Sequence, residues 1–436
     1  MNPLFSFFIL KQNIFYLQVL INGMRLFFVV IDGMGDRPDL RLGGKTPLEY
    51  ANTPNLDRLA SRGITGLVYT VGKRIAPESD IAVASLFGNK PSNYCGRGPV
   101  EAIGAGMEMR DGYLALRFNF ATVKGDKIVD RRVGRSLTER EARRLVNSLS
   151  KIKLPVKFEI KHTVGHRGVV VFKGWFSRWI TNIDPAYKNE GYGVAVKNPS
   201  SVVKRARPMN KTRAARFSAG LVNTFYKLSR EILLEHPINK RRIKNGKLPA
   251  NAILLRDAGN CVPKFRNLSE YFGYQWYAVV GMPLEQAIAK LSGMKVKSFS
   301  YPKHWNIHSY TKTEVKNMKS KTRRDGLYYL HFKQTDIAGH DADPKLKAEL
   351  IEMIDSFFSD KENDLVIVTA DHATPCSLGS HSGDPVPLLI YHPFIRSDSV
   401  SFFSERSCRR GKLGIILGYR LMPRVKRMFF SYTRKV

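Results

Sequence analysis

The chain has 436 residues and a strongly basic composition, with 71 lysines and arginines against 37 aspartates and glutamates and a formal net charge of +34. This length exceeds a typical single hydrophobic core, so two domains are expected. The basic residues are spread along the chain without zinc-finger spacing, an RNP-like motif or a basic coiled coil, which argues against a specific nucleic-acid partner. A positive field also suits an anionic small-molecule substrate.

The four cysteines, Cys95, Cys261, Cys376 and Cys408, are widely spaced and form no CxxC pair. This spacing excludes a zinc ribbon and gives no sign of a disulfide framework. The sequence therefore predicts reduced cysteines and a cytoplasmic protein.

The first 23 residues are apolar but are interrupted by Lys11, Gln12 and Asn13. The run is too broken for a transmembrane helix, and no small-residue cleavage site of a signal peptide follows it. We therefore expect residues 1–23 to be an extension or the product of a mis-set start codon, and we expect no membrane partner. A membrane anchor is the weaker alternative.

Three helices are predicted from capping and periodicity. They cover residues 48–63, which end at a glycine, residues 136–152, which begin with a Ser-x-x-Glu capping box, and residues 345–360. Two apolar segments, 154–164 and 167–174, look like neighbouring strands.

Three apolar strands each run into an aspartate: Asp32, Asp336 and Asp371. Histidines follow the second and third of these strands: His340, His372 and His381. In open α/β sheets ligands gather at the carboxyl ends of strands, so these side chains are expected to converge. Aspartate and histidine are ligands of divalent metals, and this number of them suggests two ions.

Ser79 is the candidate nucleophile of this set. It lies in a proline-containing turn, 71–80, just before the small-residue helical stretch 81–87. The dipole and N–H groups of a helix N-terminus favour an anion there, and a metal contacting the oxygen would favour the alkoxide. The alternative is that Ser79 only caps the helix. The nearby aspartates and histidines favour the nucleophile.

The metal motifs fall at both ends of the chain and leave the middle without any. This pattern predicts an inserted substrate domain at residues 108–250 within a metal-binding domain formed by 24–107 and 251–436. The candidate anion-binding side chains are Arg117, Arg131, Arg132, Arg135, His166, Arg167 and Arg256. Guanidinium groups grip carboxylate and phosphate oxygens in pairs, although any single arginine can instead be a solvated or locally paired residue.

Nine segments together resemble the archaeal-type 2,3-bisphosphoglycerate-independent phosphoglycerate mutases of the alkaline phosphatase superfamily. The resemblance runs from Met24 to near the C-terminus, and its segments are 29–38, 45–63, 76–80, 96–106, 118–123, 130–135, 236–259, 335–343 and 369–391. It implies an α/β fold: an alkaline-phosphatase-like core with a mainly parallel sheet and helices on both faces, plus an inserted α/β substrate domain.

The resemblance also implies a function. The chain would be a cytoplasmic isomerase of glycolysis and gluconeogenesis that interconverts 3-phosphoglycerate and 2-phosphoglycerate through a phosphoserine at Ser79, without 2,3-bisphosphoglycerate. One metal would be held by Asp336, His340 and His381, and the other by Asp32, Ser79, Asp371 and His372. Manganese is the first candidate, and Mg²⁺, Co²⁺ and Zn²⁺ also suit these ligands. Retaining the glycerate requires that water be excluded, which predicts a closing second domain.

The sequence departs from the family pattern at three places, one of which is the family's usual RG-G stretch, which reads Arg-Asp-Ala-Gly here at 256–259. Glu78 stands where the family has a glycine beside the nucleophile, which adds a side chain and a negative charge. The family's active-site lysine cannot be placed, and Lys312, Lys316 and Lys333 are all candidates.

Two rival functions stay open. A metal-dependent phosphatase or phosphopentomutase would share the same metal site. A basic nucleic-acid-binding protein with a decayed site would account for Glu78 and the net charge.

Overall fold

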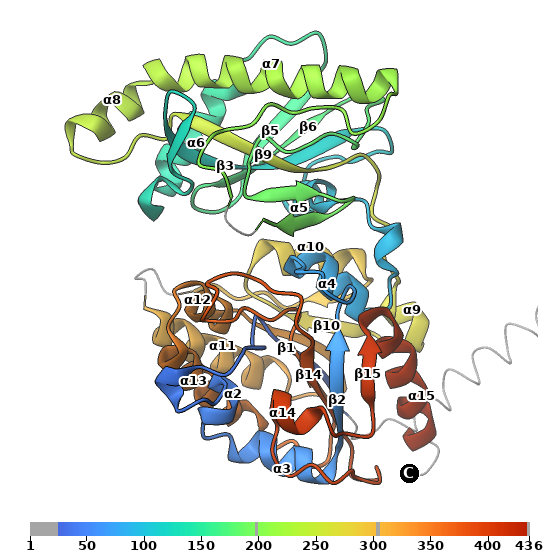
Figure 1. The fold of residues 1–436 in the computed structure, drawn as a ribbon. Helices are drawn as coiled ribbons and strands as arrows, with labels where there is room; N and C mark the ends of the chain where they lie inside the picture. The colour runs from blue at the N-terminus through green and yellow to red at the C-terminus, as the bar shows by residue number, and fades with distance from the viewer. Residues whose placement is uncertain (1–24, 197–198, 302–305, 434–436) are drawn as a thin grey trace, which may run out of the picture. The chain divides into compact units, whose positions relative to one another are not determined.

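The computed structural model describes residues 25–196, 199–301 and 306–433 (Figure 1). The predicted extension, residues 1–23, lies outside them. The chain divides into two compact units. Unit 1 comprises the chain up to Asn89, Arg266–Gly281 and the chain from Ala289 onward, and unit 2 comprises Lys90–Phe265 and Met282–Ile288.

Unit 2 begins earlier and ends later than the expected insertion, 108–250. The physical reason is that α5 (Arg97–Gly104) and β9 (Ala252–Gly259) belong to its sheet, since α5 packs on β3 (Leu114–Lys124) and β9 pairs with β3.

Unit 1 is built on an eight-stranded sheet. In spatial order its strands are β11 (Lys295–Val296), β10 (Trp276–Val279), β12 (Gly326–Phe332), β1 (Arg25–Ile31), β13 (Leu365–Thr369), β14 (Val386–Tyr391), β2 (Ile64–Tyr69) and β15 (Gly414–Leu417). The pairings that β14 makes with β13 and β2 are antiparallel, and the other pairings are parallel. The predicted α/β class with a mainly parallel sheet is confirmed.

Helices cover both faces of this sheet. Phe27 and Phe28 are consecutive in β1, so their side chains point to opposite faces. The Phe27 ring lies 5.7 Å from that of Phe357 in η4 (Ser356–Phe358), and the Phe28 ring lies 6.0 Å from that of Phe87 at the end of α4 (Ser79–Leu86). The helices that contact η4 are α3 (Pro54–Arg62), α11 (Ile307–Lys321) and α13 (Pro344–Asp355).

Two predicted helices differ from the observed ones in detail. The expected helix 48–63 is two helices, α2 (Pro47–Tyr50) and α3, because Pro54 disfavours helical backbone at the residue before it. The expected capping box at Ser136 is instead formed by Thr138 and Glu141 at the start of α6 (Glu139–Leu149). In both cases the sequence located the helix but not the residue at which it starts.

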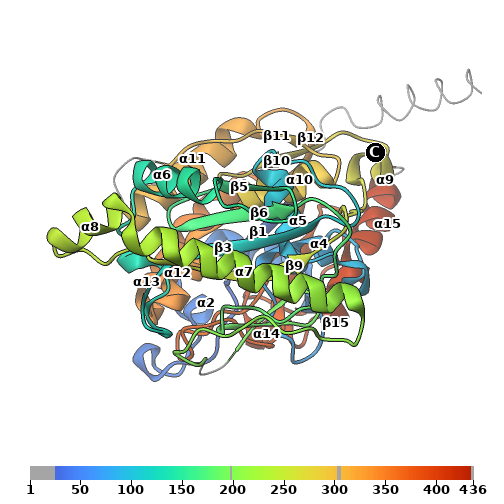
Figure 2. The same cartoon turned by 90° about the horizontal axis from the view of Figure 1, so that it is seen from above.

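Unit 2 contains a five-stranded antiparallel sheet. Its order is β4 (Lys127–Asp130), β3, β6 (Arg167–Phe172) and β5 (Phe158–His162), with β9 also paired to β3. The predicted pairing of the two neighbouring strands is confirmed by β5 and β6. The long helix α7 (Arg213–Glu235) lies over this sheet (Figures 1 and 2), where Phe225 packs edge-on against Phe158 and Phe172.

A disulfide joins Cys95 to Cys261 in unit 2, which the cysteine spacing did not predict. The two Cα atoms lie 5.7 Å apart although 166 residues separate them in sequence. The expectation of reduced cysteines is therefore wrong for this pair, because spacing along the chain gives no information about contacts made by folding. Cys376 and Cys408 are buried thiols. The cysteines thus give no argument for a reducing compartment.

The disulfide is expected to stabilise unit 2. In the chain-entropy account, closing a loop of this length lowers the entropy of the unfolded chain enough to add about 5 kcal/mol of stability. We expect the double variant Cys95→Ala, Cys261→Ala to unfold at lower urea concentration than the wild type. A reductant should lower the urea concentration at which the wild type unfolds and should not change that of the variant. If the reductant left the unfolding of the wild type unchanged, the prediction would be contradicted.

Candidate active site

The three predicted aspartates meet at one edge of the unit 1 sheet. β1 lies between β12 and β13 and is parallel to both, so the carboxyl ends of the three strands are adjacent. Asp32 directly follows β1, Asp371 follows β13, and Asp336 lies in α12 (Gln334–His340) just after β12. Because these strands are consecutive in space, residues more than 300 positions apart in sequence reach the same site.

Ser79 lies beside the imidazole of His372. It is the first residue of α4, and its Oγ is 3.2 Å from His372 Nε2. The same nitrogen is 3.2 Å from Asp32 Oδ1 and 3.4 Å from Asp371 Oδ2. Glu78, not Ser79, is the N-cap residue of the helix, and the Ser79 hydroxyl lies beside the imidazole that contacts Asp32 and Asp371. This arrangement favours the nucleophile over the capping role.

Asp336 is the centre of a second group of side chains. The Nε2 atoms of His340 and His381 each lie 3.6 Å from an oxygen of Asp336. The His381 ring also stacks on the His372 ring, with centroids 3.7 Å apart. The two predicted ligand sets therefore adjoin each other.

Outer hydrogen bonds fix the imidazole orientations. His340 Nδ1 lies 3.0 Å from the Gly379 carbonyl oxygen, and His381 Nδ1 lies 2.7 Å from that of Pro77. A carbonyl accepts only an N–H, so both rings carry a proton on Nδ1, and their Nε2 atoms face the carboxylates. Burial alone lowers the pKa of His381, but hydrogen bonding to Asp336 and its charge outweigh burial and raise that pKa to about 9.

His331 is a residue of this site that the sequence analysis missed. It is buried in β12, and its Nε2 lies 3.5 Å from Asp32 Oδ2 and 3.9 Å from Asp371 Oδ2. The Tyr329 hydroxyl lies 2.7 Å from its other ring nitrogen. The sequence did contain a sign of this position. Tyr329, His331 and Lys333 place polar atoms at every second residue of a segment that is otherwise apolar.

Lys333 is the lysine that the structure places at the site. Its ammonium forms an ion pair with Asp32 Oδ2. Lys312 and Lys316, the other two candidates, are exposed on α11. The lysine's charge helps to hold the pKa of Asp32 well below its usual range, against the opposing effect of burial.

The buried donor atoms fit divalent cations. Among the described residues, Asp32 Oδ1, Asp371 Oδ2 and His331 Nε2 are buried without a hydrogen-bond partner. Two groups of donor atoms, Asp32 with His331 and Asp371, and Asp336 with His372 and His381, are each compact enough to hold one ion. Burial and the neighbouring charge of Asp32 raise the pKa of Asp371, as expected for two buried carboxylates close together.

Glu78 does not occupy a backbone position that requires glycine. Its φ of −83° is ordinary extended backbone. Its side chain is buried, and its negative charge helps to raise the pKa of His381. The substitution therefore changes the charge beside the site and leaves the turn geometry unstrained.

Glu314 is a buried acid behind Lys333. Its Oε1 accepts a hydrogen bond of 2.5 Å from the Tyr301 hydroxyl, and its Oε2 accepts one of 3.2 Å from the Lys333 backbone N–H. Burial raises its pKa to about 8, although these bonds and the charges of His331 and Lys333 lower it.

This raised pKa predicts a pH-dependent stability. Between about pH 4.5 and pH 8 the folded chain binds a proton at Glu314 that the unfolded chain has lost, so stability falls as pH rises through that window. We expect Glu314→Gln to stabilise the protein by about 4 kcal/mol more near pH 9 than near pH 5. Thermal unfolding at both pH values would measure this, and an equal effect at both would refute it.

A group of arginines in unit 2 forms a second candidate site. Arg117 in β3 is the register partner of Arg256 in β9, and Arg167 opposite Asn119 lies on the next strand, β6. The Arg256 guanidinium lies 3.4 Å from the ring centroid of Tyr187. Together with Arg97 of α5, these side chains bring four positive charges close to one another.

The charges in this group act strongly on one another. Burial, and then the charges of Arg256 and Arg97, lower the pKa of Arg117 to about 10. Burial and the charges of Arg167 and Arg132 lower the pKa of His166 to about 3. The acids that lie among the arginines are Glu101 and Asp257. Five arginines outnumber two acids, so an anionic ligand would be stabilised here.

Two of the predicted arginines have other positions. Arg131 forms an ion pair with Asp184 and donates a hydrogen bond to the Ser200 carbonyl. Arg135 is exposed in η3 (Val133–Arg135). In contrast, Arg97 was not predicted, although it lies in one of the family-like segments, 96–106.

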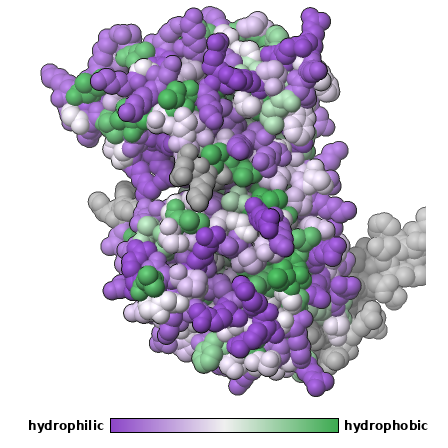
Figure 3. Space-filling model, viewed as in Figure 1, coloured by the Kyte–Doolittle hydropathy of each residue, from purple (hydrophilic) through white to green (hydrophobic). Residues whose placement is uncertain are grey.

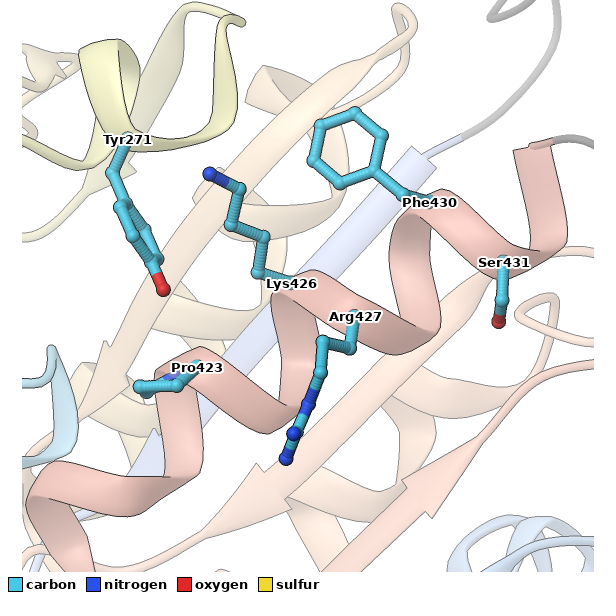
Figure 4. Close-up of a pocket in the computed structure, with 6 residues that line it drawn as sticks. All are labelled: Tyr271, Pro423, Lys426, Arg427, Phe430 and Ser431. Atoms are coloured by element: carbon cyan, nitrogen blue, oxygen red, sulfur yellow. The ribbon is translucent and has the colours of Figure 1, made fainter.

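A separate hollow on unit 1 has none of this chemistry. It lies between α9 (Leu268–Phe272) and α15 (Leu421–Thr433) (Figure 4). Its lining residues are Tyr271, Pro423, Lys426, Arg427, Phe430 and Ser431. Lys426 lies 4.0 Å from the ring centroid of Tyr271, and the Ser431 hydroxyl donates to the Met428 carbonyl. These six residues include no carboxylate or imidazole, so we assign the hollow no role in the reaction.

Within the described part of the chain, no helix is long and apolar enough to cross a membrane.

The fold and the site define a class of protein: an α/β protein with a serine at a helix N-terminus beside aspartates and histidines, the residue types found where phosphoryl transfer occurs at divalent metals. Residues 60–239 match the 2,3-bisphosphoglycerate-independent phosphoglycerate mutase family. The chain is 40% identical over 423 residues to a protein of that name from Aeropyrum pernix, covering 92% of this chain and 98% of the relative. It therefore belongs to the 2,3-bisphosphoglycerate-independent phosphoglycerate mutase family, a family of isomerases.

Two further comparisons agree with this assignment. A mutase of the same name from Pyrococcus furiosus is 39% identical over 411 residues, covering 91% of this chain and 95% of the relative. A solved cofactor-independent phosphoglycerate mutase from Thermoplasma acidophilum is 32% identical with a TM-score of 0.59, covering 93% of this chain and 99% of that one. The resemblance predicted from the sequence is confirmed.

Proposed function

We propose that this chain interconverts 3-phosphoglycerate and 2-phosphoglycerate through a phosphoserine at Ser79, without 2,3-bisphosphoglycerate. The observation that carries the proposal is the position of the Ser79 hydroxyl, 3.2 Å from His372 Nε2 at the start of α4 and beside buried aspartates. This reaction is the step of glycolysis and gluconeogenesis that the sequence predicted.

Two divalent cations would complete the site. One would be held by Asp336, His340 and His381, and the other by Asp32, Ser79, Asp371 and His372. His331 is a further donor for the second set, since it lies within reach of Asp32 and Asp371. When bound, the cations neutralise charge on the transferred phosphoryl group and favour the alkoxide of Ser79. Manganese is the first candidate, and Mg²⁺, Co²⁺ and Zn²⁺ suit the same ligands.

The residues of the chain supply the nucleophile and its surroundings. In the first step Ser79 Oγ forms a bond to phosphorus while the bond to the 3-hydroxyl oxygen of the substrate breaks, and the proton lost by the serine balances the one gained by the glycerate. In the second step the 2-hydroxyl oxygen attacks the phosphoserine and Ser79 recovers its proton. A serine intermediate thus divides the migration into two in-line displacements. The first-turn N–H groups of α4 favour the negative charge that gathers at Ser79.

The arginines of unit 2 would bind the anionic groups of phosphoglycerate. The substrate carries a carboxylate and a phosphate, and both are matched by the paired donors of guanidinium groups. Arg117, Arg167 and Arg256 on three neighbouring strands are the core of this set, with Arg97, Arg132 and His166 beside them.

The rival enzymes are distinguished by this second site. A phosphatase or phosphopentomutase would share the chemistry of Ser79 but has no need to recognise a carboxylate. The excess of arginine over acid in unit 2 favours the mutase. The other rival is a nucleic-acid-binding protein with a decayed catalytic site. The described residues give it no support, because the predicted metal ligands lie close together at one edge of the sheet.

The test is a coupled assay on the full chain. With Mn²⁺ and 3-phosphoglycerate, and without bisphosphoglycerate, enolase should convert the product to phosphoenolpyruvate while inorganic phosphate stays at background. Release of inorganic phosphate in place of 2-phosphoglycerate would make the protein a phosphatase. No turnover with any of the four metals would leave the proposal without support and favour the binding-protein rival.

A further inference from the structure

The surface of unit 2 carries an exposed aromatic cluster that the proposed reaction does not use. Trp175 is 84% exposed, Phe217 is 51% exposed, and Met209 and Trp179 are 41% and 40% exposed. Hydrophilic residues cover most of the face of the molecule in view in Figure 3, as expected for so basic a chain. Several large apolar side chains gathered at one place on such a surface are typical of an interaction site.

The segments that bear these side chains pack on each other in unit 2. The Met209 N–H donates to the Trp179 carbonyl at 2.9 Å, and Ile180 bridges to Pro208. The ring of Phe176, next to Trp175, stacks on that of Phe217 at the start of α7, with centroids 6.1 Å apart. The rings are thus held by backbone pairing and stacking.

Positive charges surround the rings. Residues 201–220 contain six basic residues and no acidic one: Lys204, Arg205, Arg207, Lys211, Arg213 and Arg216. All six are exposed, and within the described residues none of them pairs with a carboxylate. The first turn of α7 also lacks an acid, so the positive end of the helix dipole adds to their field. We call the aromatic cluster and these six residues the aromatic–basic face.

We infer that the aromatic–basic face binds single-stranded nucleic acid. Each base of a single strand presents a flat ring that can stack on tryptophan or phenylalanine, and each phosphate presents oxygens that pair with arginine. Both parts of such a ligand are matched here, because exposed rings and exposed cations occur together within residues 175–217. The inference is independent of the proposed reaction, since none of these residues belongs to either candidate site.

Two other anionic ligands fit this face less well. A membrane surface would need an apolar patch free to enter the lipid, whereas the Arg178 guanidinium lies 4.9 Å from the ring centroid of Trp179 and places a charge beside the ring. A nucleic-acid duplex keeps its bases stacked on each other and would use only the charges. The exposed rings therefore favour a single strand.

The first experiment measures anisotropy of a fluorescein-labelled oligouridylate of about 20 nucleotides titrated with the full chain at about 50 to 300 mM salt. We expect binding that weakens steeply with salt and that quenches tryptophan fluorescence. The double variant Trp175→Ala, Phe217→Ala should weaken binding about tenfold or more with an unchanged salt slope. The triple variant Lys211→Gln, Arg213→Gln, Arg216→Gln should also weaken binding and should reduce the slope.

The matched control removes three exposed charges beyond the C-terminal end of α7. Arg241→Gln, Lys244→Gln, Lys247→Gln alters α8 (Pro237–Lys244) and the residues after it, and α7 itself, with 23 residues, is about 35 Å long. It should change the affinity less than about threefold. Mutase turnover should be the same in all these variants, which also shows that they fold.

Four results would overturn the inference. They are an equal loss in both triple variants, no loss in the aromatic double variant, equal affinity for a double-stranded RNA hairpin, and binding to phosphatidylglycerol vesicles without binding to the oligouridylate. Equal affinity for oligothymidylate would support it, since both oligomers offer unpaired bases on an anionic backbone.

Discussion

Ser79→Ala is expected to lower mutase turnover by about 10⁴-fold or more, because it removes the oxygen that we propose forms the covalent bond to phosphorus. The coupled enolase assay measures this loss. Mass spectrometry of the enzyme quenched during turnover should find one phosphoryl group on the peptide containing Ser79 in the wild type and none in the variant. The fold should be unaffected, since Ser79 contributes one small hydroxyl at the start of α4.

Ser85→Ala is the matched control for this experiment. Ser85 is a buried serine of the same helix, six positions after Ser79. Its loss should leave turnover within about threefold of the wild type, as for a substitution outside the reacting centre. Retained turnover or phosphorylation in Ser79→Ala would show that the nucleophile lies elsewhere, and the proposed mechanism would then be wrong.

The convergence of the three aspartates was predictable because it depends on local pattern. Each aspartate follows an apolar strand, and parallel strands place their carboxyl ends at one edge of a sheet. The assignment of Asp32, Asp336 and Asp371 to one site therefore needed no knowledge of distances. The mainly parallel sheet was predictable for the same reason, since buried apolar strands separated by helices are typical of α/β folds.

What the sequence missed depends on register and on tertiary contact. His331 and Lys333 lie on one side of β12 with Tyr329, and only pairing with β1 brings that side to Asp32. The disulfide between Cys95 and Cys261 closes 166 residues and has no local signal. The start of unit 2 was placed too late because α5 packs on β3, which no property of α5 alone reveals.

The arginines give the clearest case of this limit. Arg131 and Arg132 are neighbours in sequence, yet Arg131 pairs with Asp184 while the charge of Arg132 acts on His166 and Arg167. Consecutive residues at a strand end point in different directions, so composition alone cannot say which of them joins a site. The two kinds of role can be tested with Arg167 and Arg131, because they predict opposite kinetic results.

Arg167→Met is expected to lower kcat/KM for 3-phosphoglycerate by about 10- to 100-fold, because a charge-assisted contact to a substrate anion contributes roughly 1.5 to 3 kcal/mol. Methionine keeps much of the side chain's apolar length, so the thermal stability should change little. Relief of like-charge repulsion with Arg97 and Arg256 should offset part of any loss of packing. The measurement is the full dependence of rate on substrate concentration, together with the melting temperature.

Arg131→Met is the matched variant with the reverse expectation. The substitution leaves the buried carboxylate of Asp184 without its ion-pair partner, which should destabilise unit 2 by about 3 kcal/mol. The kcat/KM of the folded enzyme should stay within about threefold of the wild type. If instead Arg131→Met impaired kcat/KM as much as Arg167→Met at equal stability, the anion site would have to include Arg131. The carboxylate and phosphate of the substrate would then be bound by a different group of arginines from the one on β3, β6 and β9.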